Sequence, residues 1–128
     1  MPGDYLLDAN IVIAIFNGDQ SAVANLRQGT VFLSTIVLGE LYYGAIQSSQ
    51  SLENQKPLSD FADRFTVLPV SRVTSLQYGA VKGQLRRIGR PIPDNDIWIA
   101  ACAREHGLIL ATRDEHFSYV EGLSVSRW

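Results

Sequence analysis

Short runs of apolar residues alternate with longer segments of helical periodicity along this chain. The apolar runs cover residues 5–7, 30–34, 66–70 and 108–111. A strand that is apolar throughout is buried on both faces, which is typical of parallel sheets covered by helices on both sides. The alternation therefore predicts an α/β fold of three layers, α/β/α, with a central parallel sheet of four to five strands.

Helical segments are expected between and after these runs. They cover residues 11–16, 20–28, 36–47, 52–65, 72–88 and 93–106, with a short helical turn near residues 115–119 and a weak edge strand at residues 123–125. Pro57 is expected to break its helix, because proline lacks the N–H donor and its ring crowds the preceding turn. The sequence contains no repeat and no linker, so we expect one domain over residues 1–128.

The sequence carries no pattern of export, membrane insertion or disulfide bonding. Its apolar opening, residues 5–16, is interrupted by Asp8 and Asn10 and lacks the basic region and cleavage site of a secretory signal. Cys102 is the only cysteine, which excludes an internal disulfide and a zinc site built from cysteines. We therefore expect a cytoplasmic protein without a membrane segment.

The charge of the chain limits how it can hold nucleic acid. A formal net charge of −2 argues against binding through an overall positive charge, so any such contact must be local. The candidates for it are Lys82, Arg86, Arg87 and Arg90. Three of them recur at intervals of four residues and would form a stripe on one helix, which a solvated helix face explains equally well.

Acidic residues follow the predicted strands or begin the predicted helices at one edge of the sheet. Asp8 comes directly after the first strand, and Asp114 comes two residues after the last long one ends. Glu40 lies on the helix after the second strand, and Asp96 lies in the first turn of the helix that leads into the last long strand. Ligands of parallel sheets bind beyond the carboxyl ends of the strands. Carboxylates that converge there repel one another, and a hard divalent cation would relieve the repulsion.

Each acid also has a simpler explanation. Asp8 can cap the helix that follows it, and Asp94 or Asp96 can favour the positive end of a helix, with effects of about 0.3–2 kcal/mol each. Asp114 can be a solvated loop acid beside Arg113. Glu40 is harder to explain in this way, because its helix is largely apolar and a carboxylate there needs a partner.

Taken together, these motifs resemble the PIN domains, and among them the VapC-type toxins of prokaryotic toxin–antitoxin operons. The resemblance spans nearly the whole chain. Its landmarks are residues 6–10, residues 33–34 with 39–41 and 43–44, residues 96–101, and residues 110–114 with Phe117.

The resemblance implies a metal site and a reaction. It assigns both metal binding and catalysis to Asp8, Glu40, Asp96 and Asp114. The implied ion is Mg²⁺, for which Mn²⁺ could substitute, and the implied reaction is hydrolysis of RNA phosphodiester bonds. The family more often has threonine where Ala9 stands, a change that removes a hydroxyl but no ligand.

Further polar residues are expected to support this site. Asn10, Ser34 and Thr112 lie where they could orient a carboxylate or a metal-bound water, although each is also an ordinary residue for a helix start or strand end. Asp94 could lie behind the ligands or compete with Asp96 as one. His106 and His116 have no assigned role in this interpretation.

The resemblance also implies protein partners. One is a VapB-type antitoxin whose carboxy-terminal part lies across the toxin and blocks the metal site, and the basic stripe could meet an acidic segment of it. The other is a second copy of the chain, because VapC-type toxins commonly form homodimers. Residues 36–38 and 42–43 could contribute to the dimer, although core packing explains them as well.

Two alternative interpretations differ in chemistry. A non-catalytic PIN-like RNA-binding or scaffold domain would keep the acids without a productive metal ion. A haloacid-dehalogenase-type phosphatase would need an acid at position 10, where Asn10 stands, and a receiver domain would need paired acids before the first helix and a lysine late in the sheet. The sequence has neither of these last two patterns.

Overall fold

Five parallel strands form one sheet at the centre of the computed structural model, which describes residues 3–128. The strands are β1 (Asp4–Leu7), β2 (Thr30–Ser34), β3 (Thr66–Leu68), β4 (Ile109–Ala111) and β5 (Val125–Ser126). Their order across the sheet is β3-β2-β1-β4-β5, and every neighbouring pair is parallel. The predicted parallel sheet is confirmed, although the last strand begins two residues later than expected.

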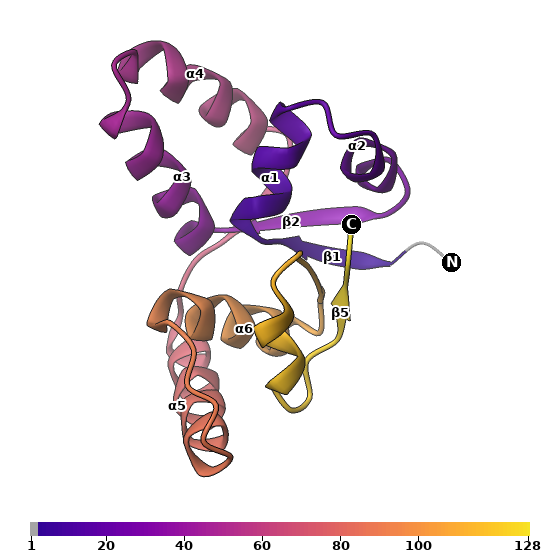
Figure 1. The fold of residues 1–128 in the computed structure, drawn as a ribbon, viewed down its shortest axis with the longest axis vertical. Coiled ribbons are helices and arrows are strands. Elements are labelled where there is room, and N and C mark those ends of the chain that lie inside the picture. Colours follow the sequence, from indigo (N-terminus) through magenta and orange to yellow (C-terminus); the bar gives the residue numbers. More distant parts are fainter. Residues whose placement is uncertain (1–2) are drawn as a thin grey trace.

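Helices cover the sheet on both sides. They are α1 (Ala9–Phe16), α2 (Gln20–Leu26), α3 (Thr35–Gln47), α4 (Ser51–Ala62), α5 (Arg72–Arg87), α6 (Asp94–His106) and the short 3-10 helix η1 (Glu115–Tyr119). Figure 1 shows α1 and α2 above strands β1 and β2, and α5 with α6 below them. The predicted three-layer arrangement is confirmed, with the pair α3 and α4 extending from one end of it (Figure 1).

The central strands are buried on both faces. Leu6 and Leu7 both have no exposed surface, although neighbouring residues of a strand point to opposite sides of the sheet. Leu33 and Leu110, on the two strands that flank β1, are also fully buried. Burying each of these side chains stabilises the fold by roughly 1.5–3 kcal/mol. This packing fixes the position of the residues that follow the carboxyl ends of β1 and β4.

Pro57 does not break its helix, so the break expected from the sequence is wrong. Helix α4 runs without interruption from Ser51 to Ala62 with Pro57 inside it. The carbonyl that loses its hydrogen bond is that of Glu53, an exposed residue, where water can replace the missing N–H donor. Leu58 and Phe61 are buried in the core and hold the second half of the helix in place.

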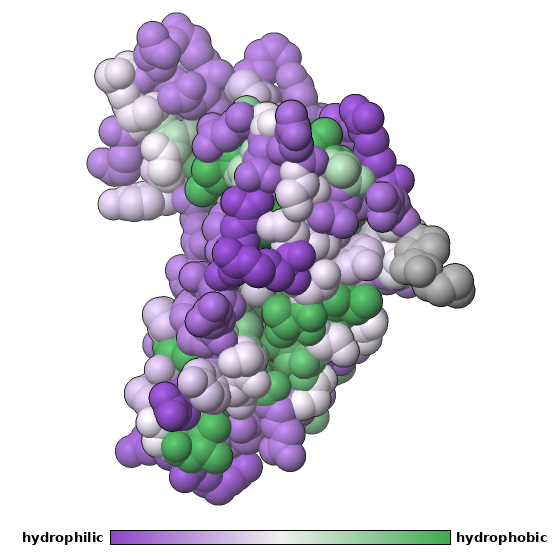
Figure 2. Space-filling view, turned by 45° about the vertical axis from the view of Figure 1, so that its right-hand side comes forward, coloured by the Kyte–Doolittle hydropathy of each residue, from purple (hydrophilic) through white to green (hydrophobic). Residues whose placement is uncertain are grey.

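The surface of the molecule is mainly hydrophilic. Figure 2 shows hydrophilic side chains over most of one face, interrupted by hydrophobic ones in the upper half, which α1 to α4 form, and by a larger patch below. Within residues 3–128, the helices are too short or too polar for any of them to cross a membrane.

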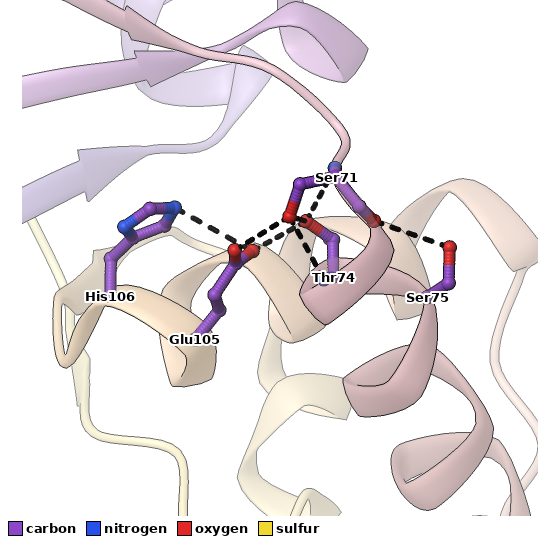
Figure 3. A network of polar contacts seen from close by, with 5 residues as sticks. All are labelled: Ser71, Thr74, Ser75, Glu105 and His106. Carbon is purple, nitrogen blue, oxygen red and sulfur yellow. Dashed lines mark hydrogen bonds and ion pairs between the residues drawn. The ribbon is translucent and has the colours of Figure 1, made fainter.

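A polar network joins the start of α5 to the end of α6 (Figure 3). Ser71 caps α5 in a capping box with Thr74, and both hydroxyls donate hydrogen bonds to the carboxylate of Glu105. Nε2 of His106 lies 3.5 Å from the same carboxylate. Because Asp96 lies at the other end of α6, this network helps to orient the helix that carries it.

Replacing Glu105 is therefore expected to loosen the contact between α5 and α6. Glu105→Ala removes a nearly buried acceptor of two hydroxyl hydrogen bonds and should lower the free energy of unfolding by about 1.5–3 kcal/mol. Urea denaturation measures the change, and Glu53→Ala, at an exposed position, serves as the control with an effect within about 0.5 kcal/mol. Equal effects of the two substitutions would show that the network does not contribute.

Candidate metal site at the carboxyl edge of the sheet

Asp8 links the end of β1 to the start of α1. Its backbone N–H donates to the carbonyl of Ala111 at 2.9 Å, which continues the pairing of β1 with β4. Its Oδ1 accepts a hydrogen bond of 2.8 Å from the N–H of Ala9, so it caps α1 as the simpler explanation has it. Capping uses only part of this carboxylate, which is 3% exposed and lies at the expected edge of the sheet.

The second oxygen of Asp8 is held by polar side chains. The hydroxyl of Thr112 donates to Oδ2 at 2.7 Å, and the amide of Asn10 lies within hydrogen-bond distance of it at 3.4 Å. The Thr112 hydroxyl also accepts from the N–H of Asp114 at 3.0 Å, and the Asn10 side chain accepts from the N–H of Arg113 at 3.3 Å. Asn10 and Thr112 therefore connect Asp8 to the loop that follows β4.

The four acids singled out in the sequence lie close enough to disturb one another. Burial raises the pKa of Asp8, and the charge of Asp114 raises it further against the hydrogen bonds from Thr112 and Ala9. Burial also raises the pKa of Glu40, with further repulsion from Asp8 and Asp96. The carboxylates from β1, α3, α6 and the loop after β4 thus form one acidic cluster.

Asp96 is the residue of α6 that belongs to this cluster. Burial is the main cause that raises its pKa, and Asp8 and Asp114 add to the effect. His116, from η1, opposes it, since its Nε2 lies 2.9 Å from Oδ2 of Asp96. One donor atom each from Asp96, Asp114 and His116 lie within 4.8 Å of one another, a spacing that could hold a metal ion.

His116 is the member of this group to which the sequence interpretation gave no role. The sequence contained one sign of it, because His116 follows Asp114 by two residues in the predicted turn. Whether that turn packs against α6 or points away from it depends on tertiary contacts. His106, the other histidine, belongs to the network around Glu105 at the far end of α6.

Two of the expected supporting residues make contacts of their own. Asp94 is the first of them. Its Oδ1 accepts hydrogen bonds from the hydroxyl of Tyr78 at 3.0 Å and from the ammonium of Lys82 at 3.2 Å. Both hydrogen bonds hold the pKa of Asp94 below its ordinary value. The interactions described for Asp94 thus lie with α5 and not with the acidic cluster. Ser34 is fully buried, and its hydroxyl accepts from the N–H of Val37 at 3.1 Å, which caps α3.

The candidate basic stripe lies on the end of α5 and the loop beyond it. Lys82 is 3.2 Å from Asp94, so part of its charge is offset. Arg86 and Arg87 are in the last turn of the helix, and the guanidinium of Arg90 lies over the ring of Tyr119 at 4.6 Å. The two arginines of the last turn are therefore the best placed of the group to meet an anionic ligand.

The chain matches known proteins over nearly its whole length. The profile of the PIN domain family matches residues 5–123. Ribonuclease VapC2 of Haemophilus influenzae is 35% identical over 128 residues, covering 97% of each chain. The tRNA(fMet)-specific endonuclease VapC of Shigella flexneri is 34% identical over 128 residues, again covering 97% of each chain.

Solved structures show the same fold. The crystal structure of VapBC2 from Rickettsia felis, bound to a DNA fragment from their promoter, has a chain that matches with a TM-score of 0.90 and 30% identity over 98% of each chain. DNA-bound VapBC from Salmonella typhimurium matches with a TM-score of 0.88 and 28% identity, covering 100% of this chain and 99% of that one.

Proposed function

The chain belongs to the PIN-domain family, in its VapC group, and on that premise we propose that it is a metal-dependent endoribonuclease and the toxin of a toxin–antitoxin pair. The observation that carries this proposal is the cluster of Asp8, Glu40, Asp96 and Asp114, in which burial and mutual repulsion raise carboxylate pKa values. A cluster of this kind is costly for the fold unless it binds a cation.

The residues of the cluster fit a divalent ion. Carboxylate oxygens are the donors that Mg²⁺ prefers, and Mn²⁺ accepts them as well. We assign the ion to Asp8, Glu40, Asp96 and Asp114, with Mg²⁺ as the expected metal. When bound, such an ion lowers the pKa of an attacking water and offsets negative charge that develops on the phosphate.

The chain's own residues contribute position and orientation. Hydrogen bonds to both oxygens of Asp8 fix that carboxylate without supplying a charge that would neutralise it. Thr112 acts as a positioning residue, since its single hydroxyl serves both Asp8 and the backbone of Asp114. Asp114 is the exposed member of the cluster and marks the side from which a substrate enters.

RNA is the substrate that this site is proposed to cut. Relatives that match 97% of the chain are named as a ribonuclease and as an endonuclease specific for tRNA(fMet). Repulsion between RNA and the acids must be overcome locally, and Arg86 and Arg87 are the exposed cations of α5 that we assign to contacts with its phosphates.

An antitoxin of the VapB type is the proposed protein partner, because the structural neighbours are VapBC complexes. A groove of about 530 Å³ between α1, α3 and α4 supports this assignment. Its lining includes the apolar side chains of Ile13, Phe16 and Leu58, together with Glu40 of the acidic cluster. A segment that fills this groove would therefore reach the site.

A homodimer is proposed as well, although fewer residues are available to it than the sequence suggested. Val37 is fully buried in the core of its own chain, and Tyr42 shares a hydrogen bond of 2.7 Å with Ser59 of α4. Tyr43 and Ile46 of α3 remain 67% and 54% exposed. These two side chains are the contacts that we assign to a second copy.

The ribonuclease proposal is tested with a mixed RNA pool and single-stranded DNA of matched length. The purified chain, freed of any co-expressed partner, is incubated with each in the presence of Mg²⁺ or Mn²⁺. Internal cuts in RNA, with DNA left intact, are expected. If neither nucleic acid is cut although the ion binds, the alternative of a non-catalytic RNA-binding or scaffold domain takes the place of the nuclease.

Thr112→Val tests the positioning role of the hydroxyl. Valine keeps the volume of threonine but removes the donor to Asp8 and the acceptor for Asp114. By analogy with residues behind metal ligands, the rate of RNA cleavage should fall by about 10–100-fold. Thr66→Val, at an exposed position of β3, is the matched control and should cleave normally. An unchanged rate in Thr112→Val would mean that the hydroxyl does not position the acids.

A further inference from the structure

His116 points a ring nitrogen into the acidic cluster. Its Nε2 atom is buried and lies 2.9 Å from Oδ2 of Asp96. Despite this short distance, Nε2 has no hydrogen-bond partner within residues 3–128, so the carboxylate oxygen lies off the direction that a hydrogen bond requires. The ring is kept in place by the fully buried Phe117, whose centroid lies 4.7 Å from it.

This arrangement has the geometry of two neighbouring ligands of one ion. Ligands at about 2.1 Å from an octahedral ion are about 3.0 Å apart when they occupy adjacent positions, and each then lies off the donor axis of the other. Both properties hold for His116 and Asp96. A hydrogen-bonded pair would show the same distance, but its donor would point at the acceptor oxygen.

Asp114 completes the set. One donor atom each of Asp96, Asp114 and His116 lie within 4.8 Å of one another, so one ion could contact all three. The side chain of Asp114 is exposed and can adjust its position to a bound ion. The donors come from α6, from the loop after β4 and from η1, so three separate parts of the chain meet at this point.

We propose that His116 is a ligand of the metal ion together with Asp96 and Asp114, and that its nitrogen makes the site prefer Mn²⁺ to Mg²⁺. The proposal rests on the metal site of the proposed function and changes its ligand set from oxygens alone to oxygens and one nitrogen. Mg²⁺ strongly prefers oxygen donors, whereas imidazole suits first-row transition metals. Mn²⁺ is therefore expected to bind at least about tenfold more tightly than Mg²⁺.

The test measures the nitrogen directly through electron spin echo modulation of bound Mn²⁺. Mn²⁺ is added to the full chain, purified without a partner, in natural abundance and with ¹⁵N-labelled histidine. The chain has two histidines, so His116→Gln is compared with the matched variant His106→Gln. Calorimetric titrations with Mn²⁺ and Mg²⁺ accompany the spectra.

A histidine nitrogen coupling that changes with the label is expected in the wild type and in His106→Gln, and should be lost in His116→Gln. His116→Gln should bind Mn²⁺ about tenfold more weakly than the wild type, whereas its affinity for Mg²⁺ should be almost unchanged. If that variant does not fold, labelled His106→Gln still decides the matter, because His116 is its only histidine. Bound Mn²⁺ without histidine coupling, in a protein that cuts RNA, overturns the role of His116 and leaves the ribonuclease intact. Failure of the wild type to bind either Mn²⁺ or Mg²⁺ overturns both.

Discussion

Asp8→Asn is expected to slow RNA cleavage by about 1000-fold or more while leaving the fold intact. Asp8 is the most deeply buried acid of the cluster, and an amide in its place cannot supply the negative oxygen that a divalent ion needs. Asparagine caps helices as well as aspartate does, and its oxygen can still accept from the N–H of Ala9. The loss should therefore reflect the metal site and not the fold, which initial rates at a fixed excess of Mg²⁺ or Mn²⁺ will measure.

Asp94→Asn and Asp96→Asn provide the matched comparison, because the two residues share the first turn of α6. Asp96 belongs to the acidic cluster, whereas Asp94 is exposed and paired with Lys82. Cleavage by Asp94→Asn should stay within about threefold of the wild type, and Asp96→Asn should resemble Asp8→Asn. Near-normal rates in Asp8→Asn, or the reverse order for the pair on α6, would contradict the assignment of the acids.

Divalent ions are expected to stabilise the wild type strongly. At a metal concentration of about 100 times the dissociation constant, binding to the folded state alone adds about 2.7 kcal/mol to the free energy of unfolding. For a domain of this size the melting temperature should rise by several degrees. Thermal unfolding with and without Mg²⁺ or Mn²⁺ measures the rise, which should nearly disappear in Asp8→Asn. The same rise in both proteins would place the bound ion elsewhere.

Without metal, the same substitution should stabilise the protein at neutral pH. Burial raises the pKa of Asp8 in the folded state, so the folded chain holds the proton more tightly than the unfolded chain does. The contribution of Asp8 to stability is thus fully present below its pKa in the unfolded chain. It is lost as the pH rises through its pKa in the folded chain. The gain in the free energy of unfolding of Asp8→Asn over the wild type should be largest near neutral pH. It should shrink as the pH falls towards the ordinary pKa of aspartate. Urea denaturation of both proteins in chelator across this pH range measures the gain. A gain that does not depend on pH would contradict the burial of a charge at this position.

The sheet was predictable because its strands carry the signal of burial in their own residues. Leu6 and Leu7 lie side by side in the sequence, and burial of both requires cover on both faces of the strand. The effect of Pro57 was not predictable in the same way. A proline breaks a helix only where the lost hydrogen bond cannot be replaced, and the exposure of Glu53 is set by the tertiary structure.

The acidic cluster follows from a rule about sheet edges, which brings together residues far apart in the sequence. Asp8 and Asp114 follow neighbouring strands, so the strand order alone places them close to each other. His116 could not be placed by that rule, because the packing of η1 against α6 decides its direction. The partner of Asp94 was equally hidden, since Lys82 reaches it from α5 through a contact between helices.

Chelation followed by restoration of metal tests the central proposal most directly. One sample of the partner-free wild type is incubated with the RNA pool in chelator, and Mg²⁺ or Mn²⁺ is then added in excess. We predict intact RNA before the addition and internal cuts after it. Cleavage that continues in the chelator, or RNA that stays intact after metal has bound, would contradict the assignment of this chain as a metal-dependent ribonuclease.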